Sequence, residues 1–134
     1  MESYLPKQSN IPEGLAFTFD FYRKICVKLP PNVDSYSIIL DCSNVSMKNF
    51  DMEFEKCDGP VLEYFAERLH LCYIINYNKV MQAIMTLMWP FIPKRTREKV
   101  KMVKIAELQK TIDIEVLPEE LGGTNTTKVI EIMQ

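Results

Sequence analysis

The stretch AERLHLCYIINYNKVMQAIMTLMWP, residues 66–90, contains the pattern that decides the fold. Its LCYII run at residues 71–75 is short, continuous and apolar, which is typical of a strand buried on both faces of a sheet. Asn78 then fits the capping position of a helix that is predicted to reach Met88, just before Pro90. A buried strand followed directly by a helix is the repeating unit of α/β proteins.

The same alternation continues on both sides of this stretch. The YSIILD run at residues 36–41 is a second strand of the buried type, and Pro30-Pro31 stops a helix before it. The other predicted elements are helices at 13–29 and 104–111, weak strands at 100–103 and 116–118, and two helical segments at 51–57 and 60–69 that Asp58-Gly59-Pro60 separates. Strands joined by helical crossovers predict an α/β fold, a mainly parallel sheet covered by helices.

The bulk composition describes an ordinary globular chain. Apolar residues make up 47% of the 134 residues and charged residues 25%, which fits one folded domain. The net charge of −2 excludes a general attraction to nucleic acid, so contact with an anionic surface has to come from a local patch. No run reaches the ~18 apolar residues of a membrane span, and the first residues lack the pattern of a signal peptide.

Four cysteines and a single histidine limit the chemistry of the chain. The cysteines, Cys26, Cys42, Cys57 and Cys72, form no CxxC pair, which argues against a zinc site. Each lies in or beside an apolar run, so we predict reduced, buried thiols in a cytoplasmic protein. A disulfide framework is the less favoured alternative.

Motifs of catalysis are missing from the sequence. It contains no GxSxG elbow, no GxxxxGK[ST] loop and no GxGxxG turn. His70 has no orienting acid that the sequence specifies, and Asp41, at the end of a predicted strand, fits a turn or a cap more simply than a catalytic acid. We predict no catalytic residue, no metal site and no cofactor, and therefore a protein that is not an enzyme.

The predicted helix at residues 78–88 is apolar over more than one face. Its polar residues Asn78, Gln82 and Thr86 are spaced four apart beside Lys79, and the rest are aliphatic or methionine. A helix that covers one face of a sheet needs an apolar stripe of only ~100°. Two interpretations remain: a helix buried between the sheet and another segment, or a helix whose second side meets a hydrophobic ligand or a membrane. Its methionines suit an adaptable surface.

The segment WPFIPKRTREK, residues 89–99, joins this helix to a dense run of cations. Only Glu98 opposes the six cations within residues 94–104, which are Lys94, Arg95, Arg97, Lys99, Lys101 and Lys104. Such a run is ordinarily a solvated face. Beside an apolar helix it can instead contact anionic lipid headgroups, at roughly 1 kcal/mol per cation. Because aromatic residues do not interleave with the cations, we expect no nucleic-acid partner.

Several of these segments together resemble the CRAL-TRIO lipid-binding domain family. YFAERLHLCYIIN (64–76), WPFIPKRTREKV (89–100) and VLPEELGGT (116–124) are similar to that family's YPERL, strand ending in IIN, KPFL, TxxK and LPxxxGG elements, in the same order. ILDCSNVSM (39–47) resembles its DLxGxS element. Within the family, FDMEF (50–54) is similar to motile-sperm-domain-containing proteins and residues 89–100 to the phosphatidylinositol transfer branch.

The resemblance implies a sheet that floors an apolar pocket and a gate helix, residues 78–91, that closes the pocket over a lipid. The side chains implied to line the gate and contact acyl chains are Val80, Met81, Ile84, Met85, Leu87, Met88 and Phe91. Positions that contact the inositol phosphate headgroup in the phosphatidylinositol-binding branch are occupied here by Glu67, Thr96 and Lys99, with Arg68 beside Glu67. Lys99 can neutralise a phosphate and Thr96 can donate to it. An ordinary surface pair of Glu67 with Lys99 is the competing interpretation.

The sequence also departs from the family pattern. Ala66 replaces the proline of YPERL, Trp89 replaces the lysine of KPFL, and Asn44 or Val45 replaces the glycine of DLxGxS. The family's N-terminal helical subdomain and one strand have no counterpart. We expect an irregular lead-in at 1–12, a shortened CRAL-TRIO-like lobe at 13–124 and a C-terminal tail at 125–134.

The functional expectation combines the residues with the resemblance. We expect non-enzymatic binding and intermembrane transfer of a hydrophobic ligand, most simply a phospholipid such as phosphatidylinositol. The protein would be cytoplasmic and peripherally membrane-associated, with Lys94, Arg95, Arg97 and Lys101 facing the anionic surface. The alternative is a degenerate lobe that acts as a docking module for a protein partner or a membrane surface.

Overall fold

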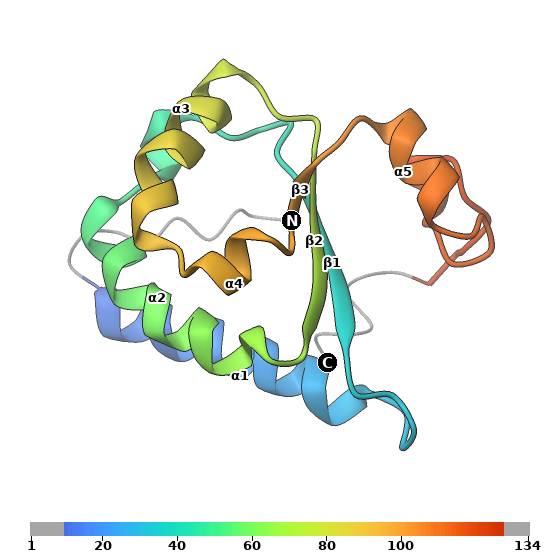
Figure 1. Ribbon diagram of the computed structural model, residues 1–134, viewed down its shortest axis with the longest axis horizontal. Helices are drawn as coiled ribbons and strands as arrows, with labels where there is room; N and C mark the ends of the chain where they lie inside the picture. Colours follow the sequence, from blue (N-terminus) through green and yellow to red (C-terminus); the bar gives the residue numbers. More distant parts are fainter. Residues whose placement is uncertain (1–9, 128–134) are drawn as a thin grey trace.

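The computed structural model of the protein describes residues 10–127, apart from the side chain of Asn49. The predicted lead-in before residue 10 and the tail after residue 127 lie outside the described residues. Helices and strands alternate as the sequence predicts (Figure 1). The elements are α1 (Ile11–Lys28), β1 (Tyr36–Asp41), α2 (Met52–Ala66), β2 (Leu69–Ile75), α3 (Lys79–Met88), α4 (Lys94–Arg97), β3 (Val100–Met102) and α5 (Ile105–Thr111), with 3₁₀ turns η1 (Met47–Asn49), η2 (Trp89–Phe91) and η3 (Glu119–Leu121).

The sheet has three strands in the order β1-β2-β3, and both pairs are parallel. The prediction of an α/β fold with a parallel sheet is therefore confirmed. In the register of the strands, Ile38 of β1 lies beside Cys72 of β2, and Tyr73 of β2 lies beside Lys101 of β3. The central strand β2 is the most buried, and its Ile75 is fully buried.

Helices cover the sheet unequally. Figure 1 shows α1, α2, α3 and α4 on one side of the sheet and α5 on the other. Side chains of β2 alternate between two core clusters, as the period of a strand requires. Cys72 and Ile74 pack with Cys42 on the side of the four helices, whereas Tyr73 and Ile75 pack with residues of the α5 side, Leu108 and Leu117.

The predicted break between residues 57 and 60 is wrong, because α2 runs through Pro60 without interruption. A proline inside a helix removes one hydrogen bond and costs about 3 kcal/mol relative to alanine. α2 packs against α1 on both sides of Pro60. Phe54 closes over Gly14, and Phe65 stacks on the ring of Tyr22 with the centroids 5.4 Å apart.

Two strand predictions also need correction. β1 is an edge strand, since within residues 10–127 it pairs with β2 alone, and it is not buried on both faces, since Leu40 is 44% exposed. Residues 116–118 form no strand among the described residues; Pro118 makes only an isolated bridge with Asn125. The proline ring has no N–H to give to a ladder, so the chain turns there into η3.

Smaller differences follow from local chemistry. α1 begins at Ile11 rather than residue 13, because Pro12 is tolerated in the first helical turn. The four cysteines are unpaired, but only Cys42 and Cys72 are buried; Cys26 is partly buried and Cys57 is exposed, contrary to the prediction of buried thiols. It shares an exposed stripe of α2 with Glu53, Pro60 and Tyr64 at helical spacing.

Candidate functional site

Helix α3 is fixed to the sheet at its amino end. The side chain of Asn78 accepts a hydrogen bond from the Met81 N–H at 2.9 Å and donates one to the carbonyl of Val45 at 3.0 Å. Asn78 therefore caps α3, as the sequence predicts, and also ties it to the loop after β1. Two residues earlier, Asn76 adopts a positive φ of 52°, and its amide donates to Asp41 at 3.1 Å.

The inner face of α3 packs against the sheet. Ile84 and Met88 are buried, at 7% and 8% exposure. Met81 and Met85 contact the cluster of Cys42, Cys72 and Ile74. These four side chains, spaced three and four apart, form the apolar stripe of an ordinary sheet-covering helix.

The exposed side of α3 is mostly polar, with Lys79, Gln82 and Thr86, and its large exposed apolar side chain is Leu87, next to the exposed aromatic residues of η2. Leu87 is 51% exposed, and in η2 Trp89 is 38% and Phe91 56% exposed. Val80 is half-buried. A helix sandwiched between the sheet and another segment would bury both sides, so that interpretation of the sequence is wrong. Within the described residues, cations approach the two rings of η2, Arg97 that of Trp89 at 6.0 Å and Lys56 that of Phe91 at 5.7 Å, whereas Leu87 stays exposed.

A polar junction joins the end of α2 to α4. The Lys99 Nζ donates a hydrogen bond to the Ala66 carbonyl at 2.6 Å, which caps the carboxyl end of α2. The carboxylate of Glu67 forms a two-pronged ion pair with the guanidinium of Arg95. Earlier in α2, the Lys56 Nζ lies 5.7 Å from the centre of the Phe91 ring of η2.

The residues predicted to contact a headgroup lie around this junction. Glu67 and Lys99 meet the same turn of α2, and Thr96 follows Arg95 in α4, where its side chain is half-buried. Arg68 is adjacent; burial raises the pKa of Tyr36 to about 12, and the positive charge of Arg68 acts in the opposite direction. The surface ion pair of Glu67 with Lys99 is not present, because the Glu67 carboxylate pairs with Arg95 and Lys99 donates to the Ala66 carbonyl.

The basic patch divides between two faces of the sheet. Lys94 and Arg95 are exposed on α4. Arg97 is held inward, with its Nε donating to the Ile92 carbonyl at 2.6 Å and its guanidinium 6.0 Å from the Trp89 ring. Lys101, however, lies beside Tyr73 in the register and therefore projects to the α5 side, because neighbouring residues of paired strands share a face. The expectation of one patch that includes Lys101 is wrong.

Asp41 and His70 have structural surroundings. The Ser43 N–H and the Asn76 amide both donate to the Asp41 carboxylate, and these bonds lower its pKa, which favours a turn-forming anion. His70 is exposed on β2.

Comparison with known proteins gives the same result as the fold. The CRAL/TRIO domain family matches residues 4–123. The chain belongs to this family. It is 31% identical over 115 residues to the phosphatidylinositol/phosphatidylcholine transfer protein SFH11 of Arabidopsis thaliana, and 27% identical over 127 residues to SFH4, of the same description and organism. A CRAL-TRIO domain-containing protein of Caenorhabditis elegans, T23G5.2, is 26% identical over 110 residues.

This CRAL/TRIO domain corresponds to a small part of each relative. The matches cover 78%, 80% and 75% of the chain, but 30%, 20% and 15% of the relatives. Within the described residues, no helix is both long enough and apolar enough to cross a bilayer.

Proposed function

We propose that this CRAL/TRIO domain binds a phospholipid, such as phosphatidylinositol, without catalysing a reaction, and transfers it between membranes. Membership of a lipid-binding family supports the proposal, as do two relatives that are phosphatidylinositol/phosphatidylcholine transfer proteins. The lipid class comes from the names of those relatives, which are far longer than this chain, so it needs its own test.

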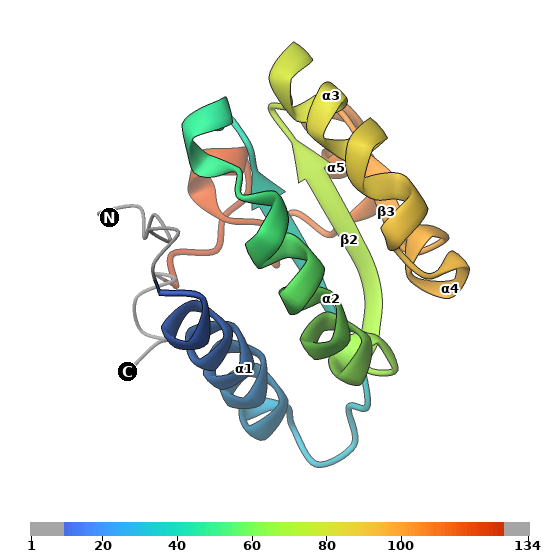
Figure 2. The same ribbon diagram turned by 90° about the vertical axis from the view of Figure 1, so that its left-hand side faces the viewer.

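The observation that carries the proposal is the outward apolar surface of α3 and η2. Leu87, Trp89 and Phe91 add exposed apolar area next to the cations Lys94 and Arg95 of α4. Figure 2 shows α3 and α4 following one another along the same side of the molecule. Apolar side chains flanked by cations are the composition of a segment that lies in the headgroup region of an anionic bilayer. We propose this surface as the membrane contact and α3 as the gate over the acyl chains.

The α2–α4 junction is the proposed headgroup site. The guanidinium of Arg95 and the ammonium of Lys99 lie at the end of α2, and Thr96 lies between these two residues in the sequence. Cations with a hydroxyl donor suit a phosphate, and the acid Glu67 suits a sugar hydroxyl. A bound phosphate would compete with Glu67 and the Ala66 carbonyl for the two cations.

Vesicle loading with two headgroups tests this assignment. We expect the Thr96→Ala/Lys99→Ala variant to lose phosphatidylinositol binding about tenfold, with a smaller loss for phosphatidylcholine, because the inositol headgroup makes more polar contacts. Since Lys99 also caps α2, the matched control is Asp51→Ala, which removes the cap at the other end of the same helix. The Asp51→Ala variant should show the same ratio of phosphatidylinositol affinity to phosphatidylcholine affinity as the wild-type protein.

The results of this experiment distinguish phospholipid binding from the alternative role of a docking module. Equal losses for both lipids would mean that Thr96 and Lys99 are structural. Failure of the wild-type protein to bind either lipid would reject the proposed function and leave a protein-docking lobe as the remaining candidate.

A further inference from the structure

Helices α1 and α2 lie side by side along one face of the molecule (Figure 2). Their contacts follow helical spacing on both helices. Gly14 lies against the ring of Phe54, and two turns further along Tyr22 stacks on Phe65. We call this contact the α1–α2 seam. Both ends of the seam are apolar and close-packed.

The middle of the seam holds a buried acid. Asp58 of α2 is 6% exposed, and Thr18 of α1 donates a hydrogen bond to its carboxylate. The other carboxylate oxygen, Oδ1, is buried without a hydrogen-bond partner. An ionised carboxylate that is buried with an unsatisfied oxygen is unfavourable, whereas the protonated acid has far less charge to solvate.

Among the described residues, no cation contributes to the pKa of Asp58. The titratable groups that act on this region are Tyr22 of α1, Asp51 and Glu55 of α2, and Tyr36 and Cys72 of the sheet. Burial is the main cause that raises the pKa of Asp58, and burial followed by Asp58 and Asp51 raises the pKa of Glu55 to about 7. The cation Arg68 acts on Tyr36 instead.

We propose that the α1–α2 seam is a proton-operated clasp, in which protonation of Asp58 and Glu55 tightens the attachment of α1 to the lobe and their ionisation loosens it. Glu55 belongs to the clasp because it lies three residues from Asp58 on the same side of α2. The effect is independent of any lipid, so it does not rest on the proposed function.

The direction of the pH effect follows from the raised pKa values. A carboxyl whose pKa is higher in the folded state binds a proton more readily when folded, so stability increases as pH falls. For Glu55 the stability changes over the pH range between its raised pKa of about 7 and its ordinary pKa of 4.5. Below that range, folded and unfolded states are equally protonated and the effect levels off.

Equilibrium unfolding between pH 8 and pH 5 tests the clasp. We expect the unfolding equilibrium constant of the wild-type protein to fall at least about tenfold over this interval. Asp58→Asn and Glu55→Gln keep the shapes of the side chains but cannot ionise, so each should flatten the dependence and the double variant should abolish most of it. Hydrogen exchange of α1 amides, corrected for the intrinsic rate, should show the same dependence in the wild type.

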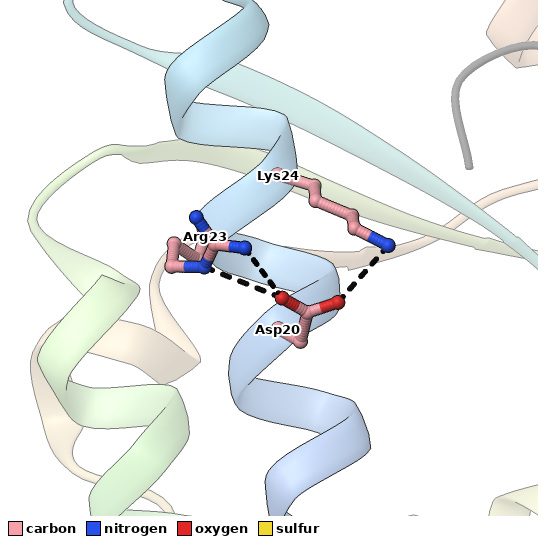
Figure 3. Close-up of polar contacts among 3 residues, drawn as sticks. All are labelled: Asp20, Arg23 and Lys24. Carbon is pink, nitrogen blue, oxygen red and sulfur yellow. Dashed lines mark hydrogen bonds and ion pairs between the residues drawn. The ribbon is translucent and has the colours of Figure 1, made fainter. Parts of the chain in front are cut away.

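Asp20 provides the matched control. It is an acid of α1 that faces solvent, where Arg23 and Lys24 bind it and lower its pKa (Figure 3). Asp20→Asn should therefore keep the wild-type pH dependence between pH 8 and pH 5. If the double variant, or Glu55→Gln alone where Asp58→Asn fails to fold, retains the wild-type dependence, the clasp is refuted. Unchanged α1 exchange across this range would refute it as well.

Discussion

Gly123 is held where no larger residue fits. Its N–H donates to the Pro118 carbonyl at 3.0 Å, and a β-carbon there would overlap the backbone of Leu117. We expect Gly123→Ala to destabilise the protein by about 3 kcal/mol, because the backbone of the turn would have to move. Denaturant unfolding measures this loss.

Gly14→Ala is the comparison for this prediction. There the nearest atoms that the added carbon would meet belong to the side-chain ring of Phe54 rather than to backbone, and a side chain can move more easily. Its cost should be smaller, about 1–2 kcal/mol. A Gly123→Ala variant at least as stable as Gly14→Ala would show that the turn at residues 118–123 is not closely packed.

Lys99 shows why residue roles are harder to predict than the fold. The resemblance of TREK to TxxK places Lys99 near Glu67, and the structure does bring them to the same turn of α2. The partner of Glu67, however, is Arg95, 28 residues away along the chain. The short helix α4 that positions Arg95 was not predicted, because its four residues are too few to give a periodic signal.

At the scale of elements, the strands could be predicted and their surroundings could not. YSIILD and LCYII are local apolar runs, so their strand structure follows from a few consecutive residues. The exposure of β1 depends on which strands are its neighbours, and the continuity of α2 through Pro60 depends on contacts with α1. Both are tertiary effects, which override local propensity.

The two sides of α3 should respond differently to substitution. Ile84→Ala removes a buried side chain from the inner face and should cost about 2–4 kcal/mol of stability. Leu87→Ser and Phe91→Ser change exposed side chains and should alter stability by only about 0.5 kcal/mol, yet weaken binding to anionic vesicles several-fold.

Thermal unfolding and vesicle co-sedimentation, performed on the same preparations, distinguish these effects. If Leu87→Ser and Phe91→Ser bind vesicles as well as the wild-type protein, the exposed apolar residues of α3 and η2 are not the membrane contact. The control Val116→Ser changes an equally exposed apolar residue of another segment, after α5, and should leave vesicle binding unchanged.

At the scale of the whole molecule, the two faces of the sheet differ in a way that agrees with lipid binding. On the α5 side, Ile75, Leu108 and Leu117 are at most 1% exposed and form a closed core. On the other side, the cluster of Cys42, Cys72 and Ile74 meets two flexible methionines of α3. Methionine accommodates irregular shapes, so this face is the more adaptable of the two.

Native mass spectrometry after incubation with liposomes tests the central claim most directly. The protein would be incubated with vesicles of phosphatidylcholine containing phosphatidylinositol, separated from them and measured under non-denaturing conditions. Phospholipid binding predicts a species heavier than the chain by the mass of one phospholipid, which disappears when the protein is unfolded before incubation. A folded protein that shows only the mass of the bare chain, and that does not bind the vesicles, would contradict the account.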